Sequence, residues 1–247
     1  TFTNATSGDT ELAVAGGTAR FDGTHNGTGK LSVASGTVSG TGTASFGSLD
    51  FTGGTLSAKV TSNGATALTG SARTLAGGEL TLNGNTAWDG SPISASGAAR
   101  IQNNAGKTFS ANADGLLANS GTAAFKNDGT FTKSAGASNG ATEIQAVFDN
   151  TGTVNANAGT LKLSGGGSSN GTIALGAGAE VQIASTDFSI TGGAINGNSG
   201  KLKLVDHTTT FSGTTSGDAE LAVTGGTAAF TGTHNGSGKL SLSSGNI

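Results

Sequence analysis

Residues 148–183 read FDNTGTVNANAGTLKLSGGGSSNGTIALGAGAEVQI, and this stretch decides the fold. Apolar and polar residues alternate in short runs such as 161–163 and 181–183, which is the period-two pattern of β-strands. A Gly-Thr-apolar triplet begins at positions 129, 152 and 171, about twenty residues apart. Two or three short strands joined by tight turns fill such a unit, so the stretch predicts stacked coils of a parallel β-helix.

The composition favours strands and turns over the whole chain. Glycine accounts for 45 of the 247 residues, and each glycine inside a helix costs about 1 kcal/mol relative to alanine, so we expect essentially no helix. The scarcity of large aliphatic residues would indicate disorder in a highly charged chain, but the net charge is only -3. The prediction is an all-β fold: a right-handed parallel β-helix (β-solenoid) with coils of about 20 residues, continuous over residues 1–247.

Turns are marked by dipeptides that accept a positive φ at low cost. They are Asp22-Gly23, Asn26-Gly27, Asn63-Gly64, Asn83-Gly84, Asp128-Gly129, Asn139-Gly140, Asn170-Gly171, Asn196-Gly197 and Asn235-Gly236. Such pairs also suit hairpins, which would give an antiparallel sandwich or barrel. A barrel needs strands of even length around a larger core, whereas the short strands and the twenty-residue spacing favour a narrow solenoid.

The two ends of the chain carry the same sequence. Residues 6–36 and 215–245 are identical at 24 of 31 positions, at an offset of 209 residues. The chain therefore holds one long repeat of 209 residues and the beginning of a second copy near residue 210, which indicates a tandem array. We expect phenylalanine columns inside the solenoid and ladders of asparagine and threonine at its turns.

Two segments resemble a known family of proteins. Residues 125–136 read FKNDGTFTKSAG, and residues 148–167 read FDNTGTVNANAGTLKLSGGG. They are similar to the repeats of filamentous-haemagglutinin-like and autotransporter-passenger adhesins, and Trp88-Asp89-Gly90 resembles the tryptophan turn of those repeats. The resemblance implies an extracellular stalk or adhesin at the bacterial cell surface.

Residues 88–106 form the least repetitive stretch of the chain. We interpret this stretch as a loop that projects from the rod. Trp88 and Asp89 are accordingly the candidate residues for contact with a partner.

The histidines do not form a catalytic pattern. His25 and His234 occupy the same position of the long repeat, within Thr-His-Asn-Gly, where we expect polar turn residues that face solvent. Asp206 and His207 could orient an imidazole as a base, but no G-x-S-x-G nucleophile motif accompanies them. The histidine spacing and the absence of cysteine give no transition-metal signature, so we predict no catalytic, cofactor or metal site.

The charged residues are dispersed along the chain. Six aspartates are expected in turns that bond their own backbone, and adventitious calcium is the one ion left open: Asp9, Asp114, Asp128, Asp149, Asp187 and Asp218. Seven cations are expected as solvated surface charges: Arg20, Lys59, Arg73, Arg100, Lys107, Lys126 and Lys133. With 15 acids spread over the chain, no cluster of the kind used by polysaccharide-processing enzymes is readable.

The predicted function is structural or adhesive, not enzymatic. We expect a rigid extracellular shaft or fibre segment whose partners are neighbouring solenoid segments, further copies of the chain, or surface glycans. The alternatives are a threonine-rich ice-binding face, a carbohydrate-binding face and, with least support, a polysaccharide-processing enzyme. A near-neutral charge predicts no nucleic-acid partner, and the absence of a run of 18 to 20 apolar residues predicts no membrane span.

Overall fold

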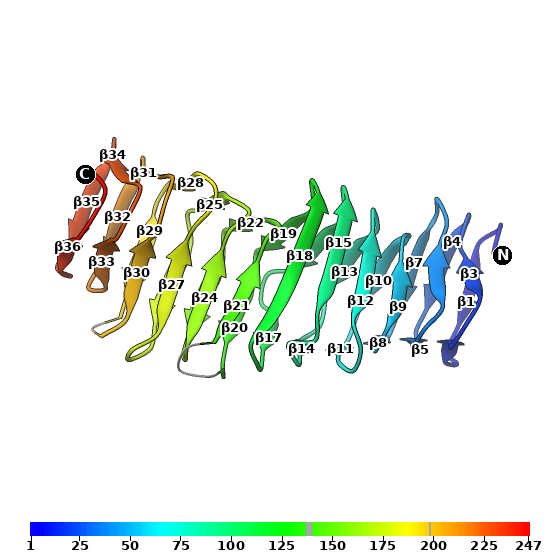
Figure 1. The fold of residues 1–247 in the computed structure, drawn as a ribbon. Coiled ribbons are helices and arrows are strands. Elements are labelled where there is room, and N and C mark those ends of the chain that lie inside the picture. The colour runs from blue at the N-terminus through cyan, green and yellow to red at the C-terminus, as the bar shows by residue number, and fades with distance from the viewer. Residues whose placement is uncertain (137–139, 198) are drawn as a thin grey trace.

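A computed structural model describes residues 1–136, 140–197 and 199–247, so Asn139 of the predicted Asn139-Gly140 turn lies outside the described residues. The described residues form 36 β-strands, and no helix among them could cross a membrane. Figure 1 shows the strands in successive coils along a rod, with the two chain ends at opposite ends. Each coil contributes one strand to each of three sheets.

Sheet 1 holds the first strand of every coil, and its neighbouring strands run parallel. Its strands are β1 (Thr6–Gly8), β4 (Thr24–Gly27), β7 (Thr43–Phe46), β10 (Lys59–Ser62), β13 (Glu79–Leu82), β16 (Arg100–Asn103), β19 (Ala124–Asn127), β22 (Val147–Asn150), β25 (Gly167–Ser169), β28 (Phe188–Ile190), β31 (Thr208–Phe211) and β34 (Thr227–Phe230).

Sheet 2 holds the second strand of every coil in the same parallel arrangement. Its strands are β2 (Leu12–Val14), β5 (Lys30–Val33), β8 (Ser48–Phe51), β11 (Thr66–Leu68), β14 (Thr86–Trp88), β17 (Thr108–Ala111), β20 (Thr130–Lys133), β23 (Thr153–Ala156), β26 (Thr172–Leu175), β29 (Gly193–Asn196), β32 (Thr214–Gly217) and β35 (Thr233–Gly236).

Sheet 3 closes the triangle with the third strand of every coil. Its strands are β3 (Thr18–Arg20), β6 (Thr37–Ser39), β9 (Gly54–Leu56), β12 (Arg73–Ala76), β15 (Ile93–Gly97), β18 (Gly115–Gly121), β21 (Ala141–Ile144), β24 (Thr160–Leu163), β27 (Glu180–Ile183), β30 (Lys201–Leu204), β33 (Glu220–Val223) and β36 (Leu240–Leu242). The all-β solenoid with coils of about 20 residues is thereby confirmed.

The Gly-Thr-apolar triplets at positions 129, 152 and 171 mark the same corner in three successive coils. Thr130 pairs with Thr153, and Thr153 pairs with Thr172, so the triplets stack in register in sheet 2. The apolar residue that follows each threonine points inward, because successive side chains of a strand point to opposite faces. Phe131, Val154 and Ile173 are at most 2% exposed.

Phenylalanine rings stack along the axis inside the rod, as predicted. The rings of Phe109 and Phe131 lie 5.5 Å apart and nearly parallel, and those of Phe125 and Phe148 lie 5.5 Å apart in a second stack. The two stacks meet edge to face, with Phe125 and Phe131 5.5 Å apart, which is a favoured arrangement of aromatic pairs.

An asparagine ladder is buried at the end of the sheet 1 strands. Asn103 Nδ2 donates to Asn127 Oδ1 at 2.7 Å, and Asn127 Nδ2 donates to Asn150 Oδ1 at 2.7 Å. Asn150 Nδ2 continues the ladder to Ser169 Oγ at 3.0 Å, and all four residues are at most 2% exposed. The ladder provides partners for the three buried Nδ2 groups, while Asn103 Oδ1 at its end has no partner among the described residues.

The predicted Asn26-Gly27 and Asn235-Gly236 turns are wrong, because both pairs lie inside strands, β4 and β35. Asn26 points outward, and Gly27 stands where the chain has no room for a side chain. A Cβ atom at Gly27 would lie 2.6 Å from Nε2 of His25 and 3.0 Å from the Gly8 carbonyl oxygen. Glycine is here favoured by the close approach of His25 and of the Gly8 carbonyl, and not by a turn.

Replacing Asn127 by alanine should destabilise the fold. The change removes the hydrogen bonds that the Asn127 amide makes with Asn103 and Asn150, and it leaves Asn150 Oδ1 without its donor. The free energy of unfolding should fall by about 1–3 kcal/mol. Asn155 of the next coil points outward, and Asn155→Ala should stay within about 0.5 kcal/mol of the wild type. Urea unfolding of both variants measures the difference; equal midpoints would show that the ladder contributes nothing.

Candidate functional site

Trp88 is buried, so it cannot contact a partner from a projecting loop. It ends β14 with 0% of its surface exposed, and its ring packs edge-on against Phe109 at 6.1 Å. Its Nε1 donates to the Ser91 carbonyl at 2.8 Å. The expectation of a loop over residues 88–106 is wrong, because β15 and β16 continue the coil and the alternation of β14 turns Trp88 inward.

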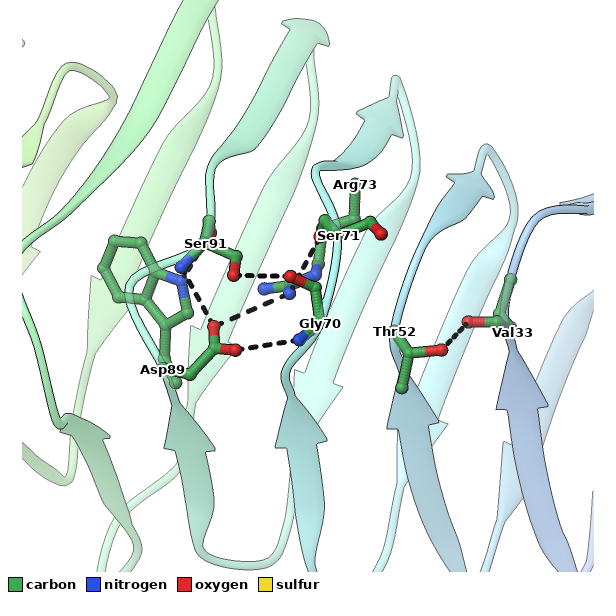
Figure 2. Close-up of polar contacts among 8 residues, drawn as sticks. Val33, Thr52, Gly70, Ser71, Arg73, Asp89 and Ser91 are labelled. Atoms are coloured by element: carbon green, nitrogen blue, oxygen red, sulfur yellow. Dashed lines mark hydrogen bonds and ion pairs between the residues drawn. The ribbon is translucent and has the colours of Figure 1, made fainter.

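Asp89 lies next to Trp88 at the corner between sheets 2 and 3, where it joins two coils (Figure 2). Its Oδ2 accepts the Gly70 amide at 2.8 Å, and its Oδ1 accepts the Ser91 amide at 2.9 Å. Ser91 Oγ donates back to the Gly70 carbonyl at 2.7 Å. Burial raises the pKa of Asp89, but the amide bonds, the Ser91 hydroxyl and the Arg73 charge together hold that pKa below its ordinary value.

Arg73 points into the core at the same corner and is 1% exposed, so its prediction as a solvated charge is wrong. Its Nη2 donates to the Ser71 carbonyl at 3.1 Å and lies 3.8 Å from Asp89 Oδ1 (Figure 2). The guanidinium carbon lies 6.0 Å from the centre of the Phe51 ring. Nε and Nη1 find no partner among the described residues, and burial lowers the pKa of Arg73, with Asp89 opposing that shift.

Lys133 is the second buried cation, and its prediction as a solvated charge is also wrong. Its side chain is 0% exposed, and Nζ donates to Asp114 Oδ1 at 2.7 Å and to the Ala135 carbonyl. Asp114 precedes β18, so this pair occupies the corner between sheets 2 and 3, as the Arg73–Asp89 pair does. Each pair balances a buried positive charge with a partly exposed carboxylate.

His25 faces the interior and is not the exposed turn residue that the sequence suggested. Its Nδ1 lies 2.9 Å from Thr6 Oγ1, and its ring lies 5.5 Å from that of Phe21 and 4.9 Å from that of Phe46. Burial lowers the pKa of His25 below its ordinary value. His234 repeats the bond to threonine but sits in the last coil, where it is exposed.

The Asp206–His207 pair is an exposed corner of the rod. His207 Nδ1 lies 3.0 Å from Asp206 Oδ1, with side chains 51% and 47% exposed, and His207 has a φ of 58°. Asp206 Oδ1 also accepts the amide of Ser185 from the preceding coil. The carboxylate therefore joins coils, and no serine Oγ lies against the imidazole in the described contacts.

Other aspartates also bond a neighbouring coil. Asp187 Oδ1 accepts the Thr208 amide at 2.8 Å, and Asp218 Oδ1 accepts the Gly197 amide at 2.7 Å. The prediction that these carboxylates bond their own backbone is wrong for both, because the stacked corners bring amides of the adjacent coil closer. Within the described residues, no three acidic or histidine side chains converge as a metal site would require.

The outer faces carry charge ladders of alternating sign. On sheet 2, Lys30 Nζ lies 3.5 Å from Glu11 and 2.9 Å from Asp50. On sheet 3, Glu220 lies 3.9 Å from Lys201 and 3.6 Å from Lys239. These exposed pairs stabilise the fold little, but they leave each ladder nearly neutral.

The outer face of sheet 2 has a shallow groove of about 430 Å³. Ala67, Ala87, Asp50, Ser110 and Asn112 are among the residues that line it. Its lining includes no aromatic ring on which a sugar could stack. The groove is a consequence of small outward residues in three consecutive coils.

A double-mutant cycle tests the Arg73–Asp89 pair. Asp89→Asn should destabilise the wild-type chain, because Arg73 then has no counter-charge. Arg73→Met should be neutral or stabilising, because it removes two buried nitrogen donors, Nε and Nη1, that have no partner among the described residues. Asp89→Asn should cost less in the Met background, with a coupling on the order of 1 kcal/mol in urea unfolding. Additive effects would contradict the pairing.

The lowered pKa of His25 predicts a stability that depends on pH. The His25 side chain of the unfolded chain takes up a proton near pH 6.5, while that of the folded chain does so only at lower pH, so the contribution of His25 leaves stability unchanged above that value and lowers it below. In His25→Phe, which keeps an aromatic ring between Phe21 and Phe46, this part of the decline should vanish. Thermal unfolding from pH 8 to pH 5 measures it; parallel curves for both proteins would contradict the inward histidine.

No protein-family model matches the chain, and comparisons with curated proteins and with solved structures found no match.

Proposed function

We propose that the chain is a section of a rigid extracellular β-solenoid shaft, structural or adhesive in function. The observation that carries the proposal is the continuity of the three sheets, each with twelve strands stacked along one axis. Backbone hydrogen bonds run along the rod in all three sheets, which makes such an object stiff. The 209-residue repeat supports extension of the same rod in a tandem array.

The surface supports many weak contacts in place of one binding pocket. Serine, threonine and asparagine side chains recur outward on successive coils, as at Ser110, Thr132 and Asn155 in sheet 2. Repeated polar groups of this kind would bind glycans or neighbouring rods through multivalency. The partners we propose are therefore neighbouring solenoid segments, copies of the chain and surface glycans.

The alternative functions have less support. A glycoside-cleaving site needs two carboxyl groups facing each other across a cleft, whereas the carboxylates described above are engaged with backbone amides or lysines. Thr108, Thr130, Thr153 and Thr172 form an outward ladder over four coils. The adjacent column changes from serine to threonine, asparagine and alanine, so this face lacks the uniform threonine array that would favour ice binding.

Electron microscopy and small-angle scattering of the purified chain test the shaft. Twelve coils spaced by about 4.8 Å should give a rod of about 55 Å. Val154→Asp puts a charge in the core and should abolish the rod, whereas the outward Asn155→Asp in the same strand should keep it. Compact particles for the wild-type chain would contradict the proposal; rods that lengthen with concentration would favour a self-assembling filament over a monomeric shaft.

A further inference from the structure

The two copies of the repeat build the same local structure at both ends of the rod. Thr6 Oγ1 lies 2.9 Å from Nδ1 of His25, and the equivalent Thr215 Oγ1 lies 2.7 Å from Nδ1 of His234. Phe2 and Phe21 stack with ring centres 4.7 Å apart, and the equivalent Phe211 and Phe230 stack at 4.7 Å. Equal sequences therefore give equal contacts.

The two copies nevertheless lie on different faces of the rod. The threonine–histidine pair joins β1 to β4 in sheet 1, but its equivalent joins β32 to β35 in sheet 2. The Glu11–Lys30 ion pair lies on sheet 2, and its equivalent Glu220–Lys239 lies on sheet 3. Strand β3 in sheet 3 likewise corresponds to β34 in sheet 1. All three correspondences move by one face in the same direction.

The shift follows from the number of strands in the repeat. β32 is the thirty-first strand after β1, and three strands make one coil, so the repeat spans ten coils and one further strand. A repeat that is not a whole number of coils cannot return to its starting face. Each successive repeat must begin one third of a turn further around the axis.

The last coil exposes apolar side chains that are buried in the first copy of the repeat. Phe230, Leu240 and Leu242 are 36%, 51% and 53% exposed, whereas their equivalents in the first copy, Phe21, Leu31 and Val33, are each 0% exposed. In the first copy the cover is the coil that follows, because Leu31 pairs with Leu49 and Val33 pairs with Phe51. Phe46 of that coil lies against His25, at 4.9 Å between ring centres. The molecule thus contains its own example of the completed interface.

We propose that the C-terminal end of the rod is a docking face for a coil with the sequence of residues 37–56, turned by one face relative to residues 37–56 of this chain. This inference rests on the proposed tandem shaft, whose next repeat supplies the coil. The bridge between Asn246 and Thr227 is the first contact of this coil with the rod. It repeats, on the neighbouring sheet, the pairing of Thr37 with Thr18 in the first copy.

The rotation has a consequence for binding. In an array, each surface feature of the repeat, such as the groove of sheet 2, appears on the three faces in turn and returns to the first face after three repeats. Three repeats span 31 coils, or about 150 Å. Such a shaft presents the same polar surface in three directions, so partners from any side meet it.

Cysteine pairs test the rotation within the chain, which has no cysteine of its own. Ala194 and Ser216 are paired outward neighbours in sheet 2, at a spacing of about 4.8 Å that permits a disulfide. Ala194→Cys with Ser216→Cys should therefore cross-link on mild oxidation. Ser189→Cys with Ser216→Cys should not, because Ser189 lies in sheet 1, where it pairs with Thr210. Cross-linking of the second pair and not the first would overturn the rotation.

A chain extended beyond Ile247 by a copy of residues 39–62 tests the docking face. Hydrogen exchange of the β35 and β36 amides should slow roughly tenfold or more. A control extension with serine in place of the copied Phe46, Leu49 and Phe51 should leave exchange unchanged. No slowing in the first chain, or equal slowing in both, would overturn the proposal. If electron microscopy shows rods but exchange does not slow, the docking proposal fails and the proposed shaft remains supported. Compact particles in the micrographs would contradict the shaft itself.

Discussion

In-register stacking of one coil on the next is the constraint on which the rest of the structure depends. Each inward side chain must cover the side chain one coil below it at a spacing of about 4.8 Å, as Val154 covers Phe131 and Ile173 covers Val154. The same register aligns backbone donors and acceptors in all three sheets. Each strand residue contacts both its own coil and the next one. The packing of the core, the side-chain ladders and the corner contacts therefore all depend on this one spacing.

The stacking rule explains which features could be predicted from sequence. Period-two runs and the Gly-Thr triplets are local signals, so strand type, coil length and the phenylalanine columns were readable. The direction of a side chain was not readable for residues next to corners. Arg73 and Lys133 are charged but face inward, because corner geometry fixes which member of a strand points to the core. The identity of a residue predicts its exposure only where it is known which residues of the strand point inward.

The corner at Trp88 is a second place where the direction of a side chain could not be predicted from sequence. The low repetitiveness of residues 88–106 predicts a projecting loop, yet β15 and β16 continue the coil, and Trp88, Asp89 and Ser91 form a hydrogen-bonded network that joins two coils. The non-repetitive segment contains an unusual buried contact, and it does not project from the rod as a loop. No sequence signal distinguishes these cases, because a buried tryptophan with a bonded Nε1 and an exposed one read alike.

The polar interior solves a problem that an apolar core leaves open. Leucine stacks on leucine equally well in any coil, so apolar columns alone would not oppose a slip of one coil along the axis. A slip would separate Arg73 from Asp89 and leave a buried cation without its counter-charge. The buried polar pairs therefore specify which coils meet. The offset of one face between the two copies depends on this matching of coils, because it follows from the thirty-one strands that separate β1 from β32.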